Sequence, residues 1–421
     1  MLPTKARSGR ASNDQLTERR RLRIAFLHPV LGIGGAERLV VDAALELQAR
    51  GHDVTIFTAE HDPGRAFPET TDGRLNVRVK GGFIPATLGG RLQAPCAIVR
   101  MCWTACAMVA NGHPFDVIVS DIAPYAIPLL RWLRARRGTR AKLVYYCHYP
   151  DQLLAPRRRG WYRYYRLPFD RLEGPAMRAA DLVLANSRFT AGAVAAFGVD
   201  VTEVIYPGVP TNSYAAVPAL RGDESIFLVV GRFDPRKNQA LAVNAFARLR
   251  HTAPEVFARS SLVLAGGLDV SRREDRETAE AIAALVRRLA LEDKVALHPS
   301  PSEMERMALL ERCLCVVHPT PDEHFGIVPV EAMAAGRPVV AVANAGPLET
   351  VVDGETGFLR EPTADAFAEA LASLGNCPAL CARLGLAGRK RAARFSRHAF
   401  GDALELALER LLGRAHVPAA P

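Results

Sequence analysis

Short apolar runs alternate with helix-length segments along this chain. The run RIAFLH (23–28) precedes a glycine-rich turn, LGIGGAE, and a segment (37–51) whose apolar residues recur at helical spacing. Uninterrupted apolar runs are typical of strands buried on both faces, and their alternation with helices indicates a parallel, doubly wound sheet. Four further strands are expected in this half of the chain: 53–59, 115–121, 141–148 and 180–187.

The same alternation restarts after YPGVPTNSY (206–214), whose prolines and glycine are typical of a linker. A chain of 421 residues also suits two domains better than one. We therefore predict an α/β protein with two Rossmann-like, doubly wound domains that face each other across a cleft. The elements expected in the second half are strands 225–233, 259–267, 294–299 and 312–319 and helices at about 238–251, 275–291, 302–311 and 327–336.

The predicted domain boundaries follow from this pattern. Residues 23–206 form the first domain and residues 207–395 the second, with a hinge near residue 207. The last helix, 396–415, is a candidate to cross back to the first domain. Residues 1–22 form a basic arm, and we expect this arm and the last six residues to be disordered.

The formal net charge of +10 lies in two patches. Residues 1–23 and 157–171 each carry a net charge of +5, so the rest of the chain sums to zero. Because no basic face covers the protein, a nucleic-acid partner is not expected. Hydrophobic residues make up 49% of the chain and charged residues 23%, which is the balance of a folded protein.

The eight cysteines form neither a CxxC pair nor a Cys/His set with zinc spacing, so we expect a reducing compartment. The N-terminus has no apolar segment before Leu22, unlike a secretory signal. The most apolar segment, 95–111, is interrupted by Arg100 and falls short of the roughly 20 residues that span a bilayer. We predict a buried helix there, and any membrane contact would be made along the protein surface.

A glycine-rich loop follows the first strand. Gly32, Gly34 and Gly35 precede a helix, and backbone N–H groups at a helix N-terminus favour an anion. A dinucleotide fingerprint would require glycine at position 37, where the chain has Glu37, which argues against a NAD-dependent oxidoreductase. Tight packing of the turn is the alternative explanation for these glycines.

A second set of candidates ends the first strand of the second domain, in GRFDPRKN (231–238). Arg232 and Lys237 can converge above the carboxyl edge of the sheet, where ligands bind in open α/β sheets. A guanidinium fork together with an ammonium suits a diphosphate, although a solvated basic turn would show the same residues.

Two glutamates, Glu323 and Glu331, flank the start of a helix in HPTPDEHFGIVPVEAMAAGRPVVA (318–341). Gly326 allows close backbone approach at this helix N-terminus, and Pro329 is tolerated in its first turn. Carboxylates accept hydrogen bonds from vicinal hydroxyls, as in ribose and hexose rings. Two carboxylates beside a diphosphate site predict a nucleotide sugar.

The E-x7-E spacing, the GR-x4-K motif and GGAER together resemble the retaining GT-B glycosyltransferases of family 4, over about residues 23–410. CHYPDQLL, RLPFDRLE, ANSRFTA and IYPGV are closest to the mannosyltransferases of dolichol-linked oligosaccharide assembly. The resemblance implies GDP-mannose as donor and a dolichyl-diphosphate oligosaccharide as acceptor. It also implies α-1,3 and/or α-1,6 linkages, formed with retention of configuration in N-glycan precursor assembly.

The resemblance assigns roles in the C-terminal, nucleotide-sugar-binding domain. It implies that Glu323 contacts the donor sugar and Glu331 the ribose, while Arg232 and Lys237 hold the diphosphate. Backbone N–H groups near Glu323 are offered to the donor by Phe325, Gly326, Ile327 and Val328.

It also assigns roles in the N-terminal, acceptor-side domain. Gly34 and Gly35 line the phosphates, and His148 in CHYPD lies beside the donor sugar. A strand-end histidine satisfied by backbone is the alternative for His148. Asp121 and Asp151 are candidates on the acceptor side.

No cofactor and no metal are expected. A sugar-nucleotide Asp-x-Asp metal motif is absent from the strand ends of the sequence, so Arg232 and Lys237 are expected to stabilise the charge that develops on the leaving diphosphate.

The segment RRRGWYRYYR interleaves arginines with aromatic rings. Arg157, Arg158 and Arg159 suit lipid head groups, and Trp161 and Tyr162 suit the membrane interface. Because the segment follows CHYPDQLLAP, a lipid-linked acceptor would arrive near it. RNA binding and a solvated face are the alternatives.

Two rival functions keep some of these features. One is a bacterial-type family 4 hexosyltransferase with another lipid or polysaccharide acceptor. The other is a non-enzymatic sugar-nucleotide- or RNA-binding protein. The expected location is the cytosolic face of the endoplasmic reticulum membrane, or the cytoplasmic face of the inner membrane in a bacterium, with other glycosyltransferases of the pathway as candidate partners.

Overall fold

The computed structural model of this chain describes residues 21–88, 92–110, 112, 114–155, 161–214, 217 and 225–413. The predicted basic arm up to residue 20, the last eight residues, and Arg157, Arg158 and Arg159 lie outside this part of the chain.

The first half of the chain forms a seven-stranded parallel sheet in the order β3-β2-β1-β4-β5-β6-β7. The strand order reverses between β1 and β4, which creates the switch point where open α/β sheets bind ligands. The strands are β1 (Arg23–Val30), β2 (Asp53–Glu60), β3 (Asn76–Val79), β4 (Val117–Asp121), β5 (Lys142–Cys147), β6 (Leu182–Ala185) and β7 (Glu203–Val204).

The second half forms a six-stranded parallel sheet in the order β10-β9-β8-β11-β12-β13. Its switch point lies between β8 and β11. The strands are β8 (Ser225–Val230), β9 (Ser260–Gly266), β10 (Val295–Pro299), β11 (Cys313–His318), β12 (Val339–Val342) and β13 (Gly357–Arg360).

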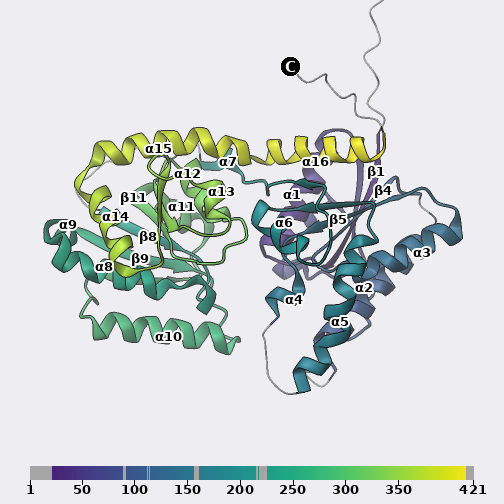
Figure 1. Ribbon diagram of the computed structural model, residues 1–421, viewed down its shortest axis with the longest axis horizontal. Helices are drawn as coiled ribbons and strands as arrows, with labels where there is room; N and C mark the ends of the chain where they lie inside the picture. The colour runs from purple at the N-terminus through teal and green to yellow at the C-terminus, as the bar shows by residue number, and fades with distance from the viewer. Residues whose placement is uncertain are drawn as a thin grey trace, which may run out of the picture.

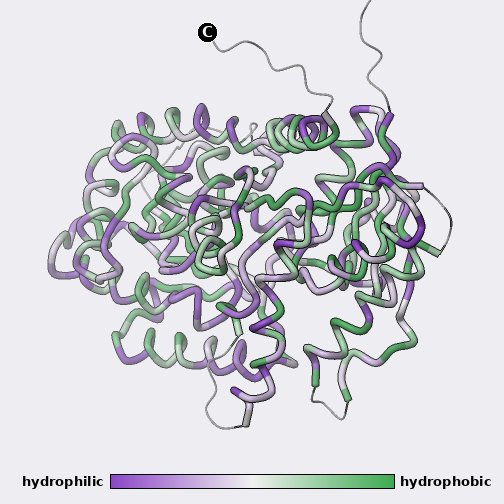
Figure 2. The backbone as a smooth tube through the Cα atoms, turned by 45° about the vertical axis from the view of Figure 1, so that its right-hand side comes forward, coloured by the Kyte–Doolittle hydropathy of each residue, from purple (hydrophilic) through white to green (hydrophobic). Residues whose placement is uncertain are grey.

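Helices cover both sheets, and the two domains lie side by side (Figure 1). The strands at the centre of each domain are mostly apolar, whereas the surrounding helices alternate between apolar and polar residues (Figure 2). The helices are α1 (Gly35–Ala49), α2 (Gln93–Ala110), α3 (Ile127–Arg137), α4 (Asp151–Leu154), α5 (Trp161–Arg178), α6 (Arg188–Ala195), α7 (Thr211–Tyr214), α8 (Gln239–Thr252), α9 (Pro254–Arg259), α10 (Arg273–Arg288), α11 (Glu303–Arg312), α12 (Ile327–Ala334), α13 (Pro347–Thr350), α14 (Ala364–Asn376), α15 (Pro378–Ala392) and α16 (Arg397–Leu411). The described residues also contain the 3-10 turns η1 (Pro63–Arg65), η2 (Pro68–Thr70), η3 (Pro124–Ala126), η4 (Pro235–Lys237) and η5 (Ala393–Phe395).

The predicted fold class, two doubly wound α/β domains, is confirmed. Four strands were not expected from the apolar runs of the sequence: β3, β7, β12 and β13. Strand β3 is a partly exposed edge strand and β7 has two residues, so neither gives a long apolar run. Strand β12 is fully buried but four residues long, which is too short to be told from the end of a helix.

Helix α16 crosses from the second domain to the first, as the yellow helix along the top of Figure 1 shows. Phe400, Leu404 and Leu408 are buried in the core formed by α1 and the N-terminal sheet. Ion pairs fix the helix as well: Arg50 Nη2 lies 2.7 Å from Asp402 Oδ1. The helix therefore ties the C-terminal end of the chain to the first domain.

Helix α2 is buried on one face and exposed on the other, which corrects the prediction of a buried helix. Arg100 lies on the buried face and donates to Glu60 Oε2 at 2.7 Å, while Val99 and Trp103 are exposed. By length and composition, α2 could cross a membrane, and the bent pair α14–α15 passes the same test jointly.

Replacing Leu404 by alanine is expected to lower the free energy of unfolding by about 2–5 kcal/mol, because it leaves a cavity between α16 and the first domain. Urea unfolding measures this loss. Leu406→Ala on the exposed side of the same helix should cost less than about 0.5 kcal/mol. Equal losses in the two variants would contradict the packing of α16.

Candidate active site

The carboxyl ends of two neighbouring strands, β8 and β11, bring Lys237 and Glu323 together. Lys237 Nζ donates to Glu323 Oε2 at 2.6 Å, although 86 positions separate the two residues in sequence. Lys237 ends the turn η4, which Asp234 caps by accepting the N–H of Arg236. The predicted proximity of these two site residues is therefore present in the structure.

The carboxylate of Glu323 also faces His318 at the end of β11. His318 Nε2 lies 3.5 Å from Glu323 Oε2, an electrostatic contact longer than a hydrogen bond. Burial opposes the ionisation of Glu323, but the imidazole of His318 and the ammonium of Lys237 outweigh it and hold the pKa of Glu323 well below its usual range. Glu323 is therefore an anion throughout the physiological range.

Glu331 lies in α12 and is held differently. Its Oε1 accepts from Tyr214 Oη at 2.8 Å and its Oε2 from Arg306 Nη1 at 2.8 Å. Burial raises the pKa of Glu331, and Arg306 opposes this rise. A carboxylate has about four lone-pair positions, so two remain for ligand hydroxyls.

The N-terminus of α12 faces the glycine-rich loop of the first domain. Gly326 caps α12 with φ of 92°, which favours glycine, and no side chain among the described residues caps the helix. A Cβ atom on Gly35 would lie 4.0 Å from Ile327 Cδ1. The N-termini of α1 and α12 therefore meet at the boundary between the two domains. Their backbone N–H groups there belong to Gly34, Gly35, Ile327 and Val328. The Phe325 ring instead packs against Tyr206 in the core, so only its backbone is available to a donor.

The Arg232 guanidinium pairs with a different carboxylate from the one that Lys237 meets. Its Nη2 donates to Asp275 Oδ2 at 3.1 Å, and half of its side chain is exposed. Lys237 lies close to the same loop, because a Cβ on Gly231 would be 3.7 Å from Lys237 Cγ. The guanidinium therefore has further N–H groups that a diphosphate could reach.

His148 follows β5 and belongs to a group of three side chains, of which Asp121 and His148 were predicted as site residues and His28 was not. Its Nε2 lies 3.1 Å from Asp121 Oδ2, and His28 Nδ1 lies 2.9 Å from both oxygens of Asp121. Burial opposes ionisation, but the two histidines lower the pKa of Asp121 to about 2. Asp121 was predicted on the acceptor side, and the structure buries it against these histidines. His28 was missed because a histidine in an apolar strand resembles a core residue.

Stacked aromatic rings join the two domains beside the predicted sugar-contacting residues. The rings of Tyr149 and His324 are 3.9 Å apart at their centroids and inclined by 7°. Burial lowers the pKa of His324 to about 4, so the ring is neutral at physiological pH. Because Tyr149 follows His148 and His324 follows Glu323, the stack places these two predicted residues on opposite sides of the domain boundary.

A carboxylate makes a second connection between the domains. Glu349 Oε2 and Oε1 accept from the backbone N–H groups of Arg188 and Phe189, each at 2.9 Å, at the start of α6. Tyr206 Oη also donates to Glu349 at 3.0 Å. This carboxylate satisfies N–H groups that a helix N-terminus leaves unpaired.

The predicted acceptor-side residue Asp151 anchors α4 to α5. Its Oδ2 accepts from Arg166 Nη2 at 2.7 Å, and its backbone N–H donates to Glu173 Oε1 at 2.6 Å. Trp161 begins α5, and Tyr162 lies on it with its ring 5.6 Å from that of Tyr165.

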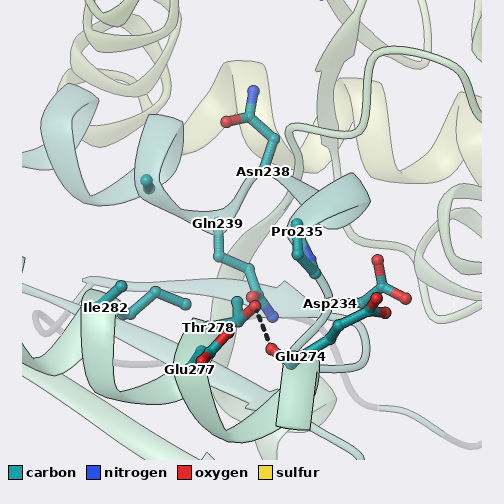
Figure 3. Close-up of a pocket in the computed structure, with 10 residues that line it drawn as sticks. Asp234, Pro235, Asn238, Gln239, Glu274, Glu277, Thr278 and Ile282 are labelled. Atoms are coloured by element: carbon teal, nitrogen blue, oxygen red, sulfur yellow. Dashed lines mark hydrogen bonds between the residues drawn. The ribbon is translucent and has the colours of Figure 1, made fainter. Parts of the chain in front are cut away.

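A separate pocket of about 380 Å³ lies between the start of α8 and helix α10 (Figure 3). Its polar lining includes Asp234, Gln239, Glu274 and Glu277. None of the predicted donor-binding residues is among those that line this pocket. The carboxylates of the pocket would also repel a diphosphate. Over the described residues, no group of three or more His, Cys, Asp or Glu could hold a metal ion.

Known proteins share this architecture. Residues 33–213 match the family model for Glycosyltransferase Family 4, and residues 211–391 match that for Glycosyl transferases group 1. Sucrose-phosphate synthase from Thermosynechococcus elongatus superposes with a TM-score of 0.73 at 25% identity, covering 94% of this chain and 100% of that structure. Anabaena HepE in complex with UDP and glucose gives 0.68 at 22% identity, covering 92% and 100%. The fold is that of a GT-B glycosyltransferase.

Closer sequence relatives define the family. The α-1,3/1,6-mannosyltransferase ALG2 of Mus musculus is 39% identical over 397 residues, which cover 90% of this chain and 94% of the relative. The protein of the same name from Homo sapiens is 39% identical over 405 residues, covering 92% and 96%. The chain belongs to the ALG2 family of α-1,3/1,6-mannosyltransferases, and the resemblance stated from its motifs is confirmed.

Arg306→Met is expected to lower the free energy of unfolding by about 3–5 kcal/mol at neutral pH, because it leaves Glu331 buried without a cation. The pKa of Glu331 is already raised from 4.5, and losing Arg306 raises it further. The folded variant then keeps the proton on Glu331 at pH values where the unfolded chain has released it, above about pH 4.5. The free energy of unfolding of the variant therefore falls as pH rises from about 4.5 to the pKa of Glu331 in the folded variant.

Urea unfolding at pH 4.5 and pH 8 measures this dependence. Glu303→Gln is the control, since it removes only the exposed partner of Arg306 and should cost at most about 1 kcal/mol. A loss in Arg306→Met that is independent of pH would contradict this description of Glu331.

Proposed function

We propose that the chain is a retaining mannosyltransferase that transfers mannose from GDP-mannose to a dolichyl-diphosphate-linked oligosaccharide. It forms α-1,3 and/or α-1,6 linkages in the assembly of the N-glycan precursor. The family supports this reaction, because relatives that bear the name α-1,3/1,6-mannosyltransferase match about nine-tenths of the chain. The observation that carries the proposal is the Lys237–Glu323 pair, which lies across the domain boundary from His148.

The donor lies between the two domains in this proposal. The diphosphate is held by Lys237 and the half-exposed Arg232, together with the N-termini of α1 and α12. Glu331 accepts hydrogen bonds from the ribose, and Glu323 from the mannose. Without donor, the ammonium of Lys237 pairs with the carboxylate of Glu323. Both charged groups are therefore already positioned at the site before the diphosphate binds.

Bond cleavage places negative charge on the departing diphosphate. Fixed cations and helix N-termini stabilise that charge without reorganising, which contributes several kcal/mol to lowering a barrier of this kind. Lys237 and Arg232 perform this role here in place of a metal ion. The acceptor hydroxyl attacks from the face that the diphosphate leaves, so the configuration at the sugar carbon is retained.

A membrane-facing surface on the first domain would receive the lipid-linked acceptor. Helix α5 exposes Tyr164 to 76% and also exposes Leu167 and Leu172. Val99 and Trp103 of α2 are exposed in the same domain, on a helix drawn beside α5 in Figure 1. Apolar and aromatic groups that follow a basic segment suit an anionic bilayer. The proposed location is the cytosolic face of the endoplasmic reticulum membrane.

The test of the function is transfer to a synthetic phytanyl-linked mannosyl-chitobiosyl diphosphate, with GDP-mannose and UDP-glucose offered in parallel. GDP-mannose should be used and UDP-glucose should not. Lys237→Ala should lower kcat by about 10²–10³-fold, because one stabilising donor to the leaving group is lost. Arg248→Ala removes a cation that pairs with the exposed Asp365 of the same domain and should leave kcat unchanged. A normal rate in folded Lys237→Ala would contradict the proposed chemistry.

The membrane contact is tested by flotation with liposomes that contain anionic lipids. Replacing Arg157, Arg158 and Arg159 by glutamine should release most of the protein from the liposomes, because each basic residue contributes about 1 kcal/mol near such a surface. The matched control replaces Arg131, Arg136 and Arg137 of α3 by glutamine. Equal flotation of the two triple variants would contradict a specific role for the segment before α5.

A further inference from the structure

A carboxylate between two imidazoles lies at the carboxyl ends of three adjacent strands. Asp121 ends β4, His28 lies in β1 and His148 follows β5. His28 Nδ1 is 2.9 Å from Asp121 Oδ1 and from Oδ2, and His148 Nε2 is 3.1 Å from Oδ2. The sheet order β1-β4-β5 makes these strands neighbours, so the fold itself brings the three side chains together.

The three side chains differ in their access to a ligand. The side chain of His28 is 0% exposed and that of Asp121 is 3% exposed, whereas 19% of His148 is exposed. Among the described residues, His28 Nε2 has no hydrogen-bond partner. His28 can therefore influence a bound sugar only through Asp121, and His148 is the member of the group that can touch one.

The contact with Asp121 determines which ring nitrogen of His148 carries the proton in the neutral imidazole. A carboxylate accepts hydrogen bonds, so the proton of the His148 ring lies on Nε2. The lone pair then lies on Nδ1, where it can accept a sugar hydroxyl. An ionised carboxylate as deeply buried as Asp121 needs a compensating partner, and His28 supplies one.

We propose that His28 is a positioning residue for sugar transfer: it fixes the Asp121 carboxylate, which in turn keeps the His148 proton on Nε2 and presents Nδ1 to the donor sugar. This inference rests on the proposed function, because it needs the donor sugar beside His148.

The charge of His28 belongs to this arrangement. Burial lowers its pKa, but Asp121 and Glu37 outweigh burial and raise the pKa of His28 above its usual range, which favours the imidazolium form. Removing this cation raises the pKa of Asp121, and the acid limb of the pH–rate profile should move to higher pH. Besides the histidines, the titratable groups that interact with the carboxylate or with His28 are Tyr145 and Tyr146 of β5 and Glu37 of α1.

Two variants of His28 separate its effects. His28→Leu removes the N–H donor and the charge, and it should lower kcat by about 10- to 100-fold with KM for GDP-mannose changed less than about threefold. His28→Asn places an amide N–H where Nδ1 was, so it should restore most of kcat. In both variants the acid limb of kcat should lie at higher pH than in the wild type.

A second buried histidine provides the matched control. His52 Nε2 lies 3.2 Å from Glu405 Oε1 on α16, so it is also a buried imidazole–carboxylate pair in this domain, but in the turn before β2. His52→Leu should lower the midpoint of urea unfolding and leave kcat and its pH profile unchanged.

Absence of transfer by the wild type would refute the proposed function, whatever the variants do. If the wild type transfers mannose, a folded His28→Leu with normal kcat and an unshifted acid limb would overturn the inference. The inference would also be overturned if kcat of His28→Leu fell only in proportion to the folded fraction and His28→Asn did not restore it. If His28→Leu does not fold, the acid limb of His28→Asn decides, because an unshifted acid limb in that variant also overturns the proposal.

Discussion

The stacked rings of Tyr149 and His324 determine how the two domains of this protein can share a site. Each domain has a switch point at the carboxyl edge of its sheet, and the proposed donor site needs both edges: the second carries the cations and the two glutamates, and the first carries His148 and the N-terminus of α1. A centroid distance of 3.9 Å between rings from different domains brings the two edges together. Since each ring is adjacent in sequence to a predicted sugar contact, this packing fixes the spacing between His148 and Glu323.

The two glutamates of the E-x7-E pattern show how the surroundings give one side chain two behaviours. Glu323 faces Lys237 and His318, and these two side chains lower its pKa and keep it ionised despite its burial. Glu331 is satisfied by Tyr214 and Arg306, and burial still raises its pKa. The first is therefore suited to remain charged beside a reacting sugar, and the second to bind hydroxyls within a hydrogen-bonded frame.

The sequence predicted the fold class because long buried strands alternate with helices. It placed Lys237 and Glu323 at the same edge of the second sheet because each follows a strand, but it did not predict that they pair. It did not predict β3 or β7, whose short or half-exposed runs carry little periodic signal. It also placed Arg232 on the diphosphate without its partner Asp275, which lies 43 positions away on α10. The sequence placed Asp121 on the acceptor side. Its burial and its contact with His28 could not be predicted, because both depend on strand order, which a single sequence does not display.

The most direct measurement is a crystal structure with GDP-mannose, or a hydrolysis-resistant analogue, bound. The account predicts the sugar between His148 and Glu323, the diphosphate within hydrogen-bond distance of Lys237 Nζ and the Arg232 guanidinium, and the ribose at Glu331. A donor bound away from the domain boundary, for example in the pocket between α8 and α10, would contradict it.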